Sequence, residues 1–376
     1  MKIAMIGHKC IPSRDGGVEV VVEELAARLA SWGHDVHCYN RVASGDGDTA
    51  RSTRLYRGIW VHASPLTEAR GIGVLIHSAG ASLKAISQSS DVIHLHAEGP
   101  ASMALLTHLA NVPTVVTIHG LDWQRIKWGR IASGVLHMGE RIAVAYADEL
   151  IVLTQSAQQY FDRIYGRAAH RLPNGVSAQP RRKPEEIARR WALQTDGYAL
   201  CLTRIVPEKG LHDLIAAFRG VPTAKRLIIA GRIDPTDPYT ARILSMAGTD
   251  RRIVLTNIVC GSTLAELLCN CCLYVLPSYV EGMSMSLLEA LSAGARCLVS
   301  GIAENRETAG RCAWYFPPGD VIALRAQLCA LLDAPDTAAD RMARIRHVRE
   351  HHNWNDIAHA TLRIYEKAIG RSHRYA

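Results

Sequence analysis

Residues 274–294 read Tyr274-Val-Leu-Pro-Ser-Tyr-Val-Glu281-Gly282-Met-Ser-Met-Ser-Leu-Leu-Glu289-Ala-Leu-Ser-Ala-Gly294. The apolar run at 273–276 predicts a buried parallel strand, and the Pro-Ser pair after it ends the strand. Ser284 is placed to cap a helix of apolar periodicity that stops at Gly294. Because the first turn of a helix presents unpaired N–H groups and about half a positive charge, this loop suits a phosphate.

Two carboxylates frame the loop. Glu281 lies within it, and Glu289 lies about five residues into the expected helix, ~7 Å along the helix axis. A carboxylate repels phosphate but accepts hydrogen bonds from hydroxyl groups. A ligand with two sugars flanking a diphosphate offers both kinds of group. By spacing alone, a solvated loop residue and an exposed helix position explain the two side chains as well.

The two glutamates belong to a longer pattern, Pro-Ser-x-x-Glu-Gly-x(6)-Glu-Ala-x-x-x-Gly. It resembles the Glu-x7-Glu element of the retaining glycosyltransferases of family 4, which have the GT-B fold. The resemblance implies that Glu281 contacts the transferred sugar and that Glu289 contacts the ribose of the nucleotide. It also implies that the donor is bound by the residues that follow Glu281, namely Gly282, Met283, Ser284, Met285 and Ser286.

A second loop carries two cations. The apolar strand expected at 198–203 runs into Arg204-Ile-Val-Pro-Glu-Lys209-Gly210, and a helix of apolar periodicity follows. Arg204 and Lys209 therefore flank one loop at the carboxyl end of a strand, within reach of a common anion. The resemblance implies that they bind the donor diphosphate. A fixed cation pair stabilises a leaving nucleotide without a metal ion, so we expect no cofactor beyond the nucleoside diphosphate sugar.

The chain opens with a strand at 2–7, a loop containing Gly16 and Gly17, and a helix, as nucleotide-binding α/β units do. The spacing is not the Gly-x-Gly-x-x-Gly fingerprint of dinucleotide enzymes, and a pair of turn glycines explains it equally. In family 4, this loop approaches the donor phosphate and the acceptor. His119 follows the strand expected at 114–118, at the edge where open α/β sheets bind ligands. The resemblance implies a place beside the transferred sugar for it.

The segment after His119 interleaves aromatic and cationic residues, as Gly120-Leu-Asp-Trp-Gln-Arg-Ile-Lys-Trp-Gly-Arg130. It is similar to a segment of family 4 proteins that serve bacterial polysaccharide assembly, rhamnosyltransferase-like sequences among them. Trp123, Arg125 and Lys127 are the candidate acceptor-binding residues, suited to an acceptor diphosphate or to a lipid interface. An ordinary loop whose tryptophans pack inward is the alternative.

We expect no metal site. His94 and His96 project to the same side of one expected strand, but the pattern offers no third ligand, so hydrogen-bonded histidines are the better interpretation. The ten cysteines include a group at 269–272 that lacks a second cluster to complete a zinc site. Buried reduced thiols explain these residues, and they fit a reducing compartment.

The net charge of +8 raises nucleic acid as a partner, but no nucleic-acid motif accompanies the basic residues. Runs of basic residues are typical of solvated helix faces, so we expect no nucleic-acid partner. The runs are Arg181-Arg-Lys183 with Arg189 and Arg190, and Arg341, Arg344, Arg346 and Arg349. The first residues predict a strand rather than a leader, and no apolar run approaches the ~20 residues of a spanning helix. We therefore expect a cytoplasmic protein without a membrane anchor of its own. The segment at 120–130, which suits a lipid interface, adds the expectation of peripheral contact at the inner face of the cytoplasmic membrane.

Alternating strands and helices imply parallel sheets with helices on both faces. Further strands are expected at 35–39, 59–63, 91–96, 149–153, 227–231, 253–257 and 297–300, and a charged helix at 181–195. The length of 376 residues suits two domains. We predict an α/β protein with two doubly wound Rossmann-like domains. The resemblance implies that they have the GT-B arrangement and face a central cleft. It also implies that residues 1–175 form the acceptor domain, 176–353 the nucleotide-sugar domain, and 354–376 a helix that crosses back to the first domain.

The resemblance covers nearly the whole chain. It implies a retaining, metal-independent transfer of a hexose-type sugar from a nucleoside diphosphate sugar to a hydroxyl acceptor. The expected acceptor is a glycan or a polyprenyl-diphosphate-linked acceptor in bacterial surface polysaccharide synthesis, and the expected catalytic residues are His119, Arg204, Lys209 and Glu281. A non-catalytic nucleotide-sugar-binding subunit is the alternative. An oxidoreductase is disfavoured, because the dinucleotide fingerprint is absent.

Overall fold

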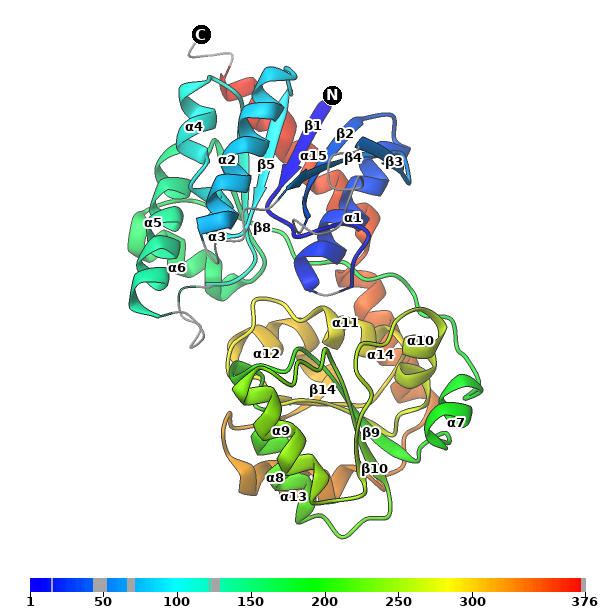
Figure 1. Ribbon diagram of the computed structural model, residues 1–376. Coiled ribbons are helices and arrows are strands. Elements are labelled where there is room, and N and C mark those ends of the chain that lie inside the picture. The colour runs from blue at the N-terminus through cyan, green and yellow to red at the C-terminus, as the bar shows by residue number, and fades with distance from the viewer. Residues whose placement is uncertain (15, 43–52, 66–71, 122, 124–128, 373–376) are drawn as a thin grey trace. The chain divides into compact units, whose positions relative to one another are not determined.

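The computed structural model describes residues 1–14, 16–42, 53–65, 72–121, 123 and 129–372. The chain divides into two compact units, Met1–Asn174 with Trp354–Ala376, and Gly175–Asn353. Figure 1 labels the helices and strands of both units. Within the described part of the chain, no helix combines the length and the apolar character needed to cross a membrane.

The first unit is built on a parallel sheet. Its elements are β1 (Lys2–Ile6), α1 (Gly17–Ser31), β2 (Asp35–Val42), β3 (Thr53–Tyr56), β4 (Ile59–Pro65), α2 (Ile72–Ser87), β5 (Val92–His96), α3 (Glu98–Ala101), α4 (Ala104–Leu109), β6 (Thr114–Ile118), α5 (Arg130–Tyr146), β7 (Glu149–Val152), α6 (Gln155–Tyr165), β8 (His170–Arg171) and α15 (Trp354–Ser372). The strand order among the described residues is β3-β4-β2-β1-β5-β6-β7-β8. Every neighbouring pair is parallel except β3 and β4 at one edge.

Side-chain alternation along β1 divides the core of the first unit in two. Ile3 and Met5 pack with residues of α1 and α15, whereas Ala4 and Ile6 pack with residues of α2, α5 and α6. Figure 1 shows the same division, with α1 and α15 on one side of the strands and α2 to α6 on the other. Because successive strand side chains point to opposite faces, a strand segment buried on both faces is apolar on both, as residues 3–6 of β1 are.

The second unit is a smaller sheet with its own helices. Its elements are α7 (Glu186–Trp191), β9 (Tyr198–Leu202), η3 (Pro207–Lys209), α8 (Leu211–Arg219), β10 (Arg226–Ala230), α9 (Pro238–Gly248), β11 (Ile253–Leu255), α10 (Gly261–Asn270), β12 (Leu273–Leu276), α11 (Met285–Ser292), β13 (Cys297–Ser300), α12 (Ala303–Ala309), η4 (Gly310–Cys312), β14 (Ala313–Phe316), α13 (Val321–Leu331) and α14 (Ala338–His351). Its strand order is β11-β10-β9-β12-β13-β14, and all pairs are parallel. The direction of winding reverses between β9 and β12.

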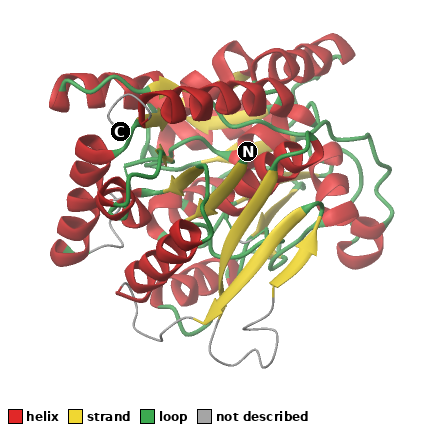
Figure 2. Ribbon diagram, turned by 90° about the horizontal axis from the view of Figure 1, so that it is seen from above, coloured by secondary structure: helices red, strands yellow, loops and turns green. Residues whose placement is uncertain are grey.

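Helices cover both faces of this second sheet (Figure 1), and Figure 2 shows in a second view that red helices surround the yellow strands. On one face, residues of β9, β10 and β12 pack with α8, α9 and α13, and on the other face with α10, α11 and α14. Open doubly wound sheets bind ligands beyond the carboxyl ends of the strands, where the winding reverses. The fold therefore predicts a ligand site at the loops that follow β9 and β12.

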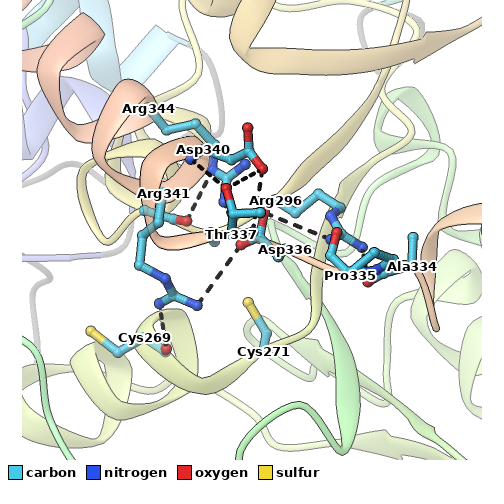
Figure 3. A network of polar contacts seen from close by, with 12 residues as sticks. Cys269, Cys271, Arg296, Ala334, Pro335, Asp336, Thr337, Asp340, Arg341 and Arg344 are labelled. Atoms are coloured by element: carbon cyan, nitrogen blue, oxygen red, sulfur yellow. Dashed lines mark hydrogen bonds and ion pairs between the residues drawn. The ribbon is translucent and has the colours of Figure 1, made fainter.

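At the opposite, amino end of β13, a network of arginines holds the last helices of this unit in place (Figure 3). Asp336 accepts a hydrogen bond from Arg344 at 2.5 Å and lies 3.6 Å from Arg296 and 3.9 Å from Arg341. Arg296 also donates to the main-chain carbonyls of Leu331, Ala334 and Pro335. Arg296 and Arg344 are each only 3% exposed. The interpretation of the 341–349 run as a solvated face is therefore wrong for Arg344.

The predicted α/β class with two parallel, Rossmann-like sheets is confirmed. The charged helix expected at 181–195 is wrong in extent, since α7 covers only Glu186–Trp191. Pro184 disfavours helical geometry in the residue before it, and the left-handed conformation of Ala192 ends the helix (φ 50°). Sequence analysis missed β3, β8 and β14.

Candidate functional site

The loops after β9 and β12 are in direct contact at the point where the winding reverses. Gly210 has a φ of +64°, and a Cβ added there would lie 2.2 Å from the carbonyl oxygen of Pro277. The amide of Tyr279 donates a hydrogen bond of 2.9 Å to the carbonyl of Glu208. Only glycine permits this close approach. Gly210 therefore holds the loop at 204–210, here called the cation loop, against the loop at 277–284, here called the glutamate loop.

Lys209 and Glu281 join the same two loops through their side chains. The Lys209 ammonium lies 2.5 Å from Glu281 Oε1, and the two side chains are 12% and 7% exposed. An ammonium carries three N–H donors, so the bond to Glu281 is compatible with a further bond to an anion. The sequence predicted a cation and a carboxylate at one site, and the structure shows them bonded to each other.

Helix α11 begins beside these loops, as the sequence predicted. Ser284 is its N-cap, and the Ser284 hydroxyl accepts a hydrogen bond of 3.3 Å from the amide of Leu287. Tyr274, the second residue of β12, donates from its hydroxyl to Ser286 Oγ at 2.7 Å. Burial raises the pKa of Tyr274 well above its usual value, so this hydroxyl keeps its proton. The first turn of α11 is thereby fixed to the strand beneath it.

A second cluster fixes the glutamate loop from the side of α8. The Tyr279 hydroxyl donates to Asp213 and lies 3.2 Å from His212 Nε2, and the other ring nitrogen of His212 bonds to Tyr239 at 2.9 Å. Burial, followed by the bond to Asp213, raises the pKa of Tyr279. Because Tyr279 stands two residues before Glu281, this cluster sets the path of the loop that carries the carboxylate.

The remaining predicted donor residues lie around the same loops. Met283 is buried, whereas the other members of the set are half-buried: Arg204, Gly282, Met285, Ser286 and Glu289. Glu289 is on the second turn of α11, on the same short helix as Ser286. The predicted residues of the second unit thus all lie on these two loops and on the first two turns of α11.

In the first unit, Gly16 and Gly17 begin α1 as its N-cap and first residue. A Cβ added at Gly16 would lie 2.5 Å from Glu19 Oε2, and Glu19 Oε1 accepts a hydrogen bond of 2.9 Å from the amide of Lys9. Glu19 is 8% exposed. The absence of a side chain at Gly16 therefore leaves room for a buried carboxylate that holds the loop following β1.

His119 lies directly after β6, at the carboxyl edge of the first sheet, and is half-buried. Its Nε2 is 3.0 Å from Nδ1 of His96, the last residue of the neighbouring strand β5. His94, two residues before His96, bonds to Thr117 and to Tyr365 of α15 at 2.7 Å each. The hydrogen-bonded interpretation of His94 and His96 is confirmed, and His96 becomes a partner of a candidate catalytic residue.

Trp123 is anchored toward the interior of the first unit. Its indole N–H donates to Glu140 Oε2 at 3.0 Å, and its ring stacks on His137 with centroids 5.1 Å apart. Glu140 is fully buried and also accepts hydrogen bonds from Tyr160 and Tyr165. These contacts favour the packed interpretation for Trp123. Arg125, Lys127 and Trp128 lie outside the described residues.

Sequence reasoning missed His96, Glu140 and Tyr279 as members of the site regions. The alternation of His94 and His96 along one strand was a usable signal, because it places both rings on one face. Glu140 and Tyr279 gave no such signal, since each finds its partners at distant sequence positions. Within the described residues, no group of three or more His, Cys, Asp or Glu side chains could hold a metal ion. Metal independence stays a prediction.

Solved structures of known proteins share this fold, with two Rossmann-like units in one chain. The sucrose-phosphate synthase of Thermosynechococcus elongatus superposes with a TM-score of 0.85 at 19% identity, over 98% of this chain and 99% of that chain. HepE of Anabaena, in complex with UDP-glucose, gives a TM-score of 0.78 at 17% identity, over 97% and 99%. These likenesses define the class of the fold as that of the GT-B glycosyltransferases.

Sequence comparison identifies the family. Residues 15–180 match the family model described as Glycosyltransferase Family 4, and residues 197–334 match the model described as Glycosyl transferases group 1. A glycogen synthase of Mycobacterium tuberculosis is 29% identical over 414 residues, which cover 97% of this chain and 94% of that protein. The chain is a glycosyltransferase of the family 4 type.

Proposed function

We propose that the protein is a retaining hexosyltransferase that uses a nucleoside diphosphate sugar as donor and needs no metal ion. The observation that carries this proposal is the Lys209–Glu281 bond of 2.5 Å, because it joins the cation loop to the glutamate loop beside the start of α11. A cation, a carboxylate and the positive end of a helix suit the diphosphate and the hydroxyl groups of one ligand.

In the proposed reaction, the acceptor hydroxyl attacks the anomeric carbon from the face that the diphosphate leaves. A new C–O bond forms as the bond to the diphosphate breaks, and a β-phosphate oxygen takes the acceptor proton. Arg204 and Lys209 stabilise the charge that accumulates on the leaving diphosphate. Glu281 orients the transferred sugar and Glu289 binds the ribose, while His119 contacts the transferred sugar.

We further propose that the acceptor is a glycan or a polyprenyl-diphosphate-linked acceptor in bacterial surface polysaccharide synthesis, with a rhamnosyltransferase-like subset of family 4 as the relevant relatives. The proposed location is the cytoplasm, with peripheral contact at the inner face of the membrane. Ile131, Val135 and Met138 support this contact, because they are exposed at helical spacing on α5, directly after the basic aromatic segment.

The test is sugar transfer from a panel of UDP, GDP and dTDP sugars to a polyprenyl-diphosphate-linked glycan, with NMR of the anomeric proton to establish retention. Lys209→Ala is expected to lower turnover by two to three orders of magnitude, the equivalent of ~3–4 kcal/mol of lost electrostatic stabilisation. Lys225→Ala is the matched control, because Lys225 pairs with Asp333, away from these loops. Normal turnover in the Lys209 variant would refute the proposed role of Lys209 in sugar transfer.

A further inference from the structure

Three histidine rings form a contiguous group at the carboxyl edge of the first sheet. The rings of His94 and His96 lie with centroids 4.0 Å apart, and those of His96 and His119 lie 5.3 Å apart. A hydrogen bond of 3.0 Å joins His96 Nδ1 and His119 Nε2. Since β5 and β6 are paired in parallel with His96 opposite Thr117, the sheet register itself sets this contact.

His96 carries a single ring proton. Its side chain is 1% exposed, and burial lowers the pKa of His96 well below its usual value, with further lowering by His94 and His119. A neutral imidazole has one N–H donor and one acceptor nitrogen. The hydrogen bond between His96 and His119 therefore permits two arrangements. Either His96 Nδ1 carries the proton and donates, or His119 Nε2 carries the proton and donates.

The second ring nitrogen of His96 separates these alternatives. Nε2 of His96 is buried and has no hydrogen-bond partner among the described residues. If His119 donated, the His96 proton would sit on Nε2, as a buried N–H group without an acceptor. If His96 donates, Nε2 carries only a lone pair. Unpaired buried N–H groups are rarer in proteins than unpaired acceptors, so the second arrangement is favoured.

We infer that His96 is a positioning residue, which donates from Nδ1 to His119 Nε2 and thereby holds His119 in the tautomer with its proton on Nδ1. Its consequence for catalysis rests on the proposed function. His119 would then meet the transferred sugar as a hydrogen-bond donor, and not as a base. That role agrees with a retaining reaction in which the donor phosphate accepts the acceptor proton.

The test is the tautomer of His119 in the full-length chain with ¹⁵N-labelled histidine, read from two-bond ¹H–¹⁵N correlations at pH 8. The His119 signals are assigned by their loss in His119→Asn. His96→Asn keeps an N–H donor close to the position of Nδ1, whereas His96→Leu fills similar space without a donor. Thermal unfolding checks that both variants fold, and turnover and donor affinity are measured beside the spectra.

We expect the proton on Nδ1 of His119 in the wild type and in His96→Asn, and a shift toward the Nε2 tautomer in His96→Leu. Turnover should fall at least about tenfold in His96→Leu, by analogy with the loss that follows removal of the partner that orients a metal-binding histidine. Donor affinity should be unchanged, and turnover should recover in His96→Asn. A wild-type proton on Nε2, an unchanged tautomer in His96→Leu, or unchanged turnover despite a changed tautomer would overturn the inference. A wild type with the expected tautomer but without transfer activity would refute the proposed function and leave the tautomer assignment standing.

Discussion

At the scale of single residues, the coupling of Lys209 to Glu281 deserves a quantitative test, because it links two loops that are distant in sequence. Each side chain is mostly buried, so removing one leaves the other charge in a poorly solvated place. The bond therefore has a structural consequence that is separate from any contact with a ligand.

We predict a coupling free energy of about 1–3 kcal/mol between these residues. It is obtained from the free energies of unfolding of Lys209→Met, Glu281→Gln and the double variant, measured with urea. The control is the same cycle on Arg189 and Glu186, an exposed pair on one turn of α7, for which exposed pairs typically give about 0.2–1 kcal/mol. Equal coupling free energies for the two pairs would show that the Lys209–Glu281 bond contributes no more to stability than an exposed ion pair.

The sequence indicated the candidate residues of this site, but not the residues to which they bond. Lys209, Glu281 and His119 each follow a short apolar strand, where ligands bind, and the resemblance to family 4 gave each of them its expected role. Their bonds join residues 72 and 23 positions apart, and no local pattern encodes such pairs. The contacts arise from which strands are neighbours and from the residues at which the strands end, which only the folded chain fixes.

At the scale of elements, helix α11 has a cap that can be changed without removing it. Ser284→Asn and Ser284→Asp both keep a side-chain acceptor for the Leu287 amide, since Asn and Asp are good N-cap residues. Only Asp places a negative charge where the proposed diphosphate binds. We predict similar stability for the two variants and weaker nucleotide binding for Ser284→Asp, measured by calorimetry. Equal affinities for the nucleotide would contradict an anion site at this helix start.

The turn that holds the cation loop offers a second test. Gly210 and Gly261 both have positive φ angles, of +64° and +60°, but a Cβ at Gly261 would meet nothing within 4 Å. Gly261→Ala should cost only the conformational strain, about 1–2 kcal/mol. Gly210→Ala should cost more and also lower turnover, because the added methyl group displaces Pro277. Similar unfolding free energies in urea would contradict the close approach of the two loops.

Elements were predictable where the pattern was strong. The cap at Ser284 and the stop at Gly294, which has a φ of +77°, were both recognised in advance. Strand β3 escaped because it is an edge strand whose residues are mostly exposed, so it lacks an apolar run. The helix expected at 181–195 was too long, because charged residues continued the pattern past the positions where the backbone ends the helix.

At the scale of the whole molecule, the two units should differ in acid sensitivity. Burial lowers the pKa of His8 and His94 to about 3, and that of His62 and His77 to about 4. All four lie in the first unit. These groups are neutral in the folded state, whereas the unfolded chain binds protons below about pH 6.5. Keeping these four histidines neutral therefore has no effect on the free energy of unfolding above pH 6.5. The free energy of unfolding falls as the pH drops from 6.5 toward 4 for His62 and His77, and toward 3 for His8 and His94.

We predict that acidification from pH 7 to pH 4.5 opens the first unit before the second. Hydrogen exchange followed by mass spectrometry, corrected for intrinsic rates, can compare peptides of β1 and β5 with those of β9 and β12. His77→Gln is the matched control, because a glutamine can still donate to the Asn40 carbonyl that His77 contacts but binds no proton. It should reduce the pH dependence by up to about 1.4 kcal/mol per pH unit. Earlier opening of the second unit would contradict this account.

The most direct measurement of the central claim is thermal stabilisation of the protein by UDP, GDP, dTDP, their sugar conjugates and NAD(P)H. A ligand at about a hundredfold its dissociation constant adds ~2.7 kcal/mol of stability. We predict that one nucleotide family stabilises the wild type, and that Lys209→Ala and Glu289→Ala lose most of this stabilisation. Stabilisation by nicotinamide cofactors alone, or equal stabilisation of the variants and the wild type, would contradict a nucleoside diphosphate sugar bound at the loops after β9 and β12.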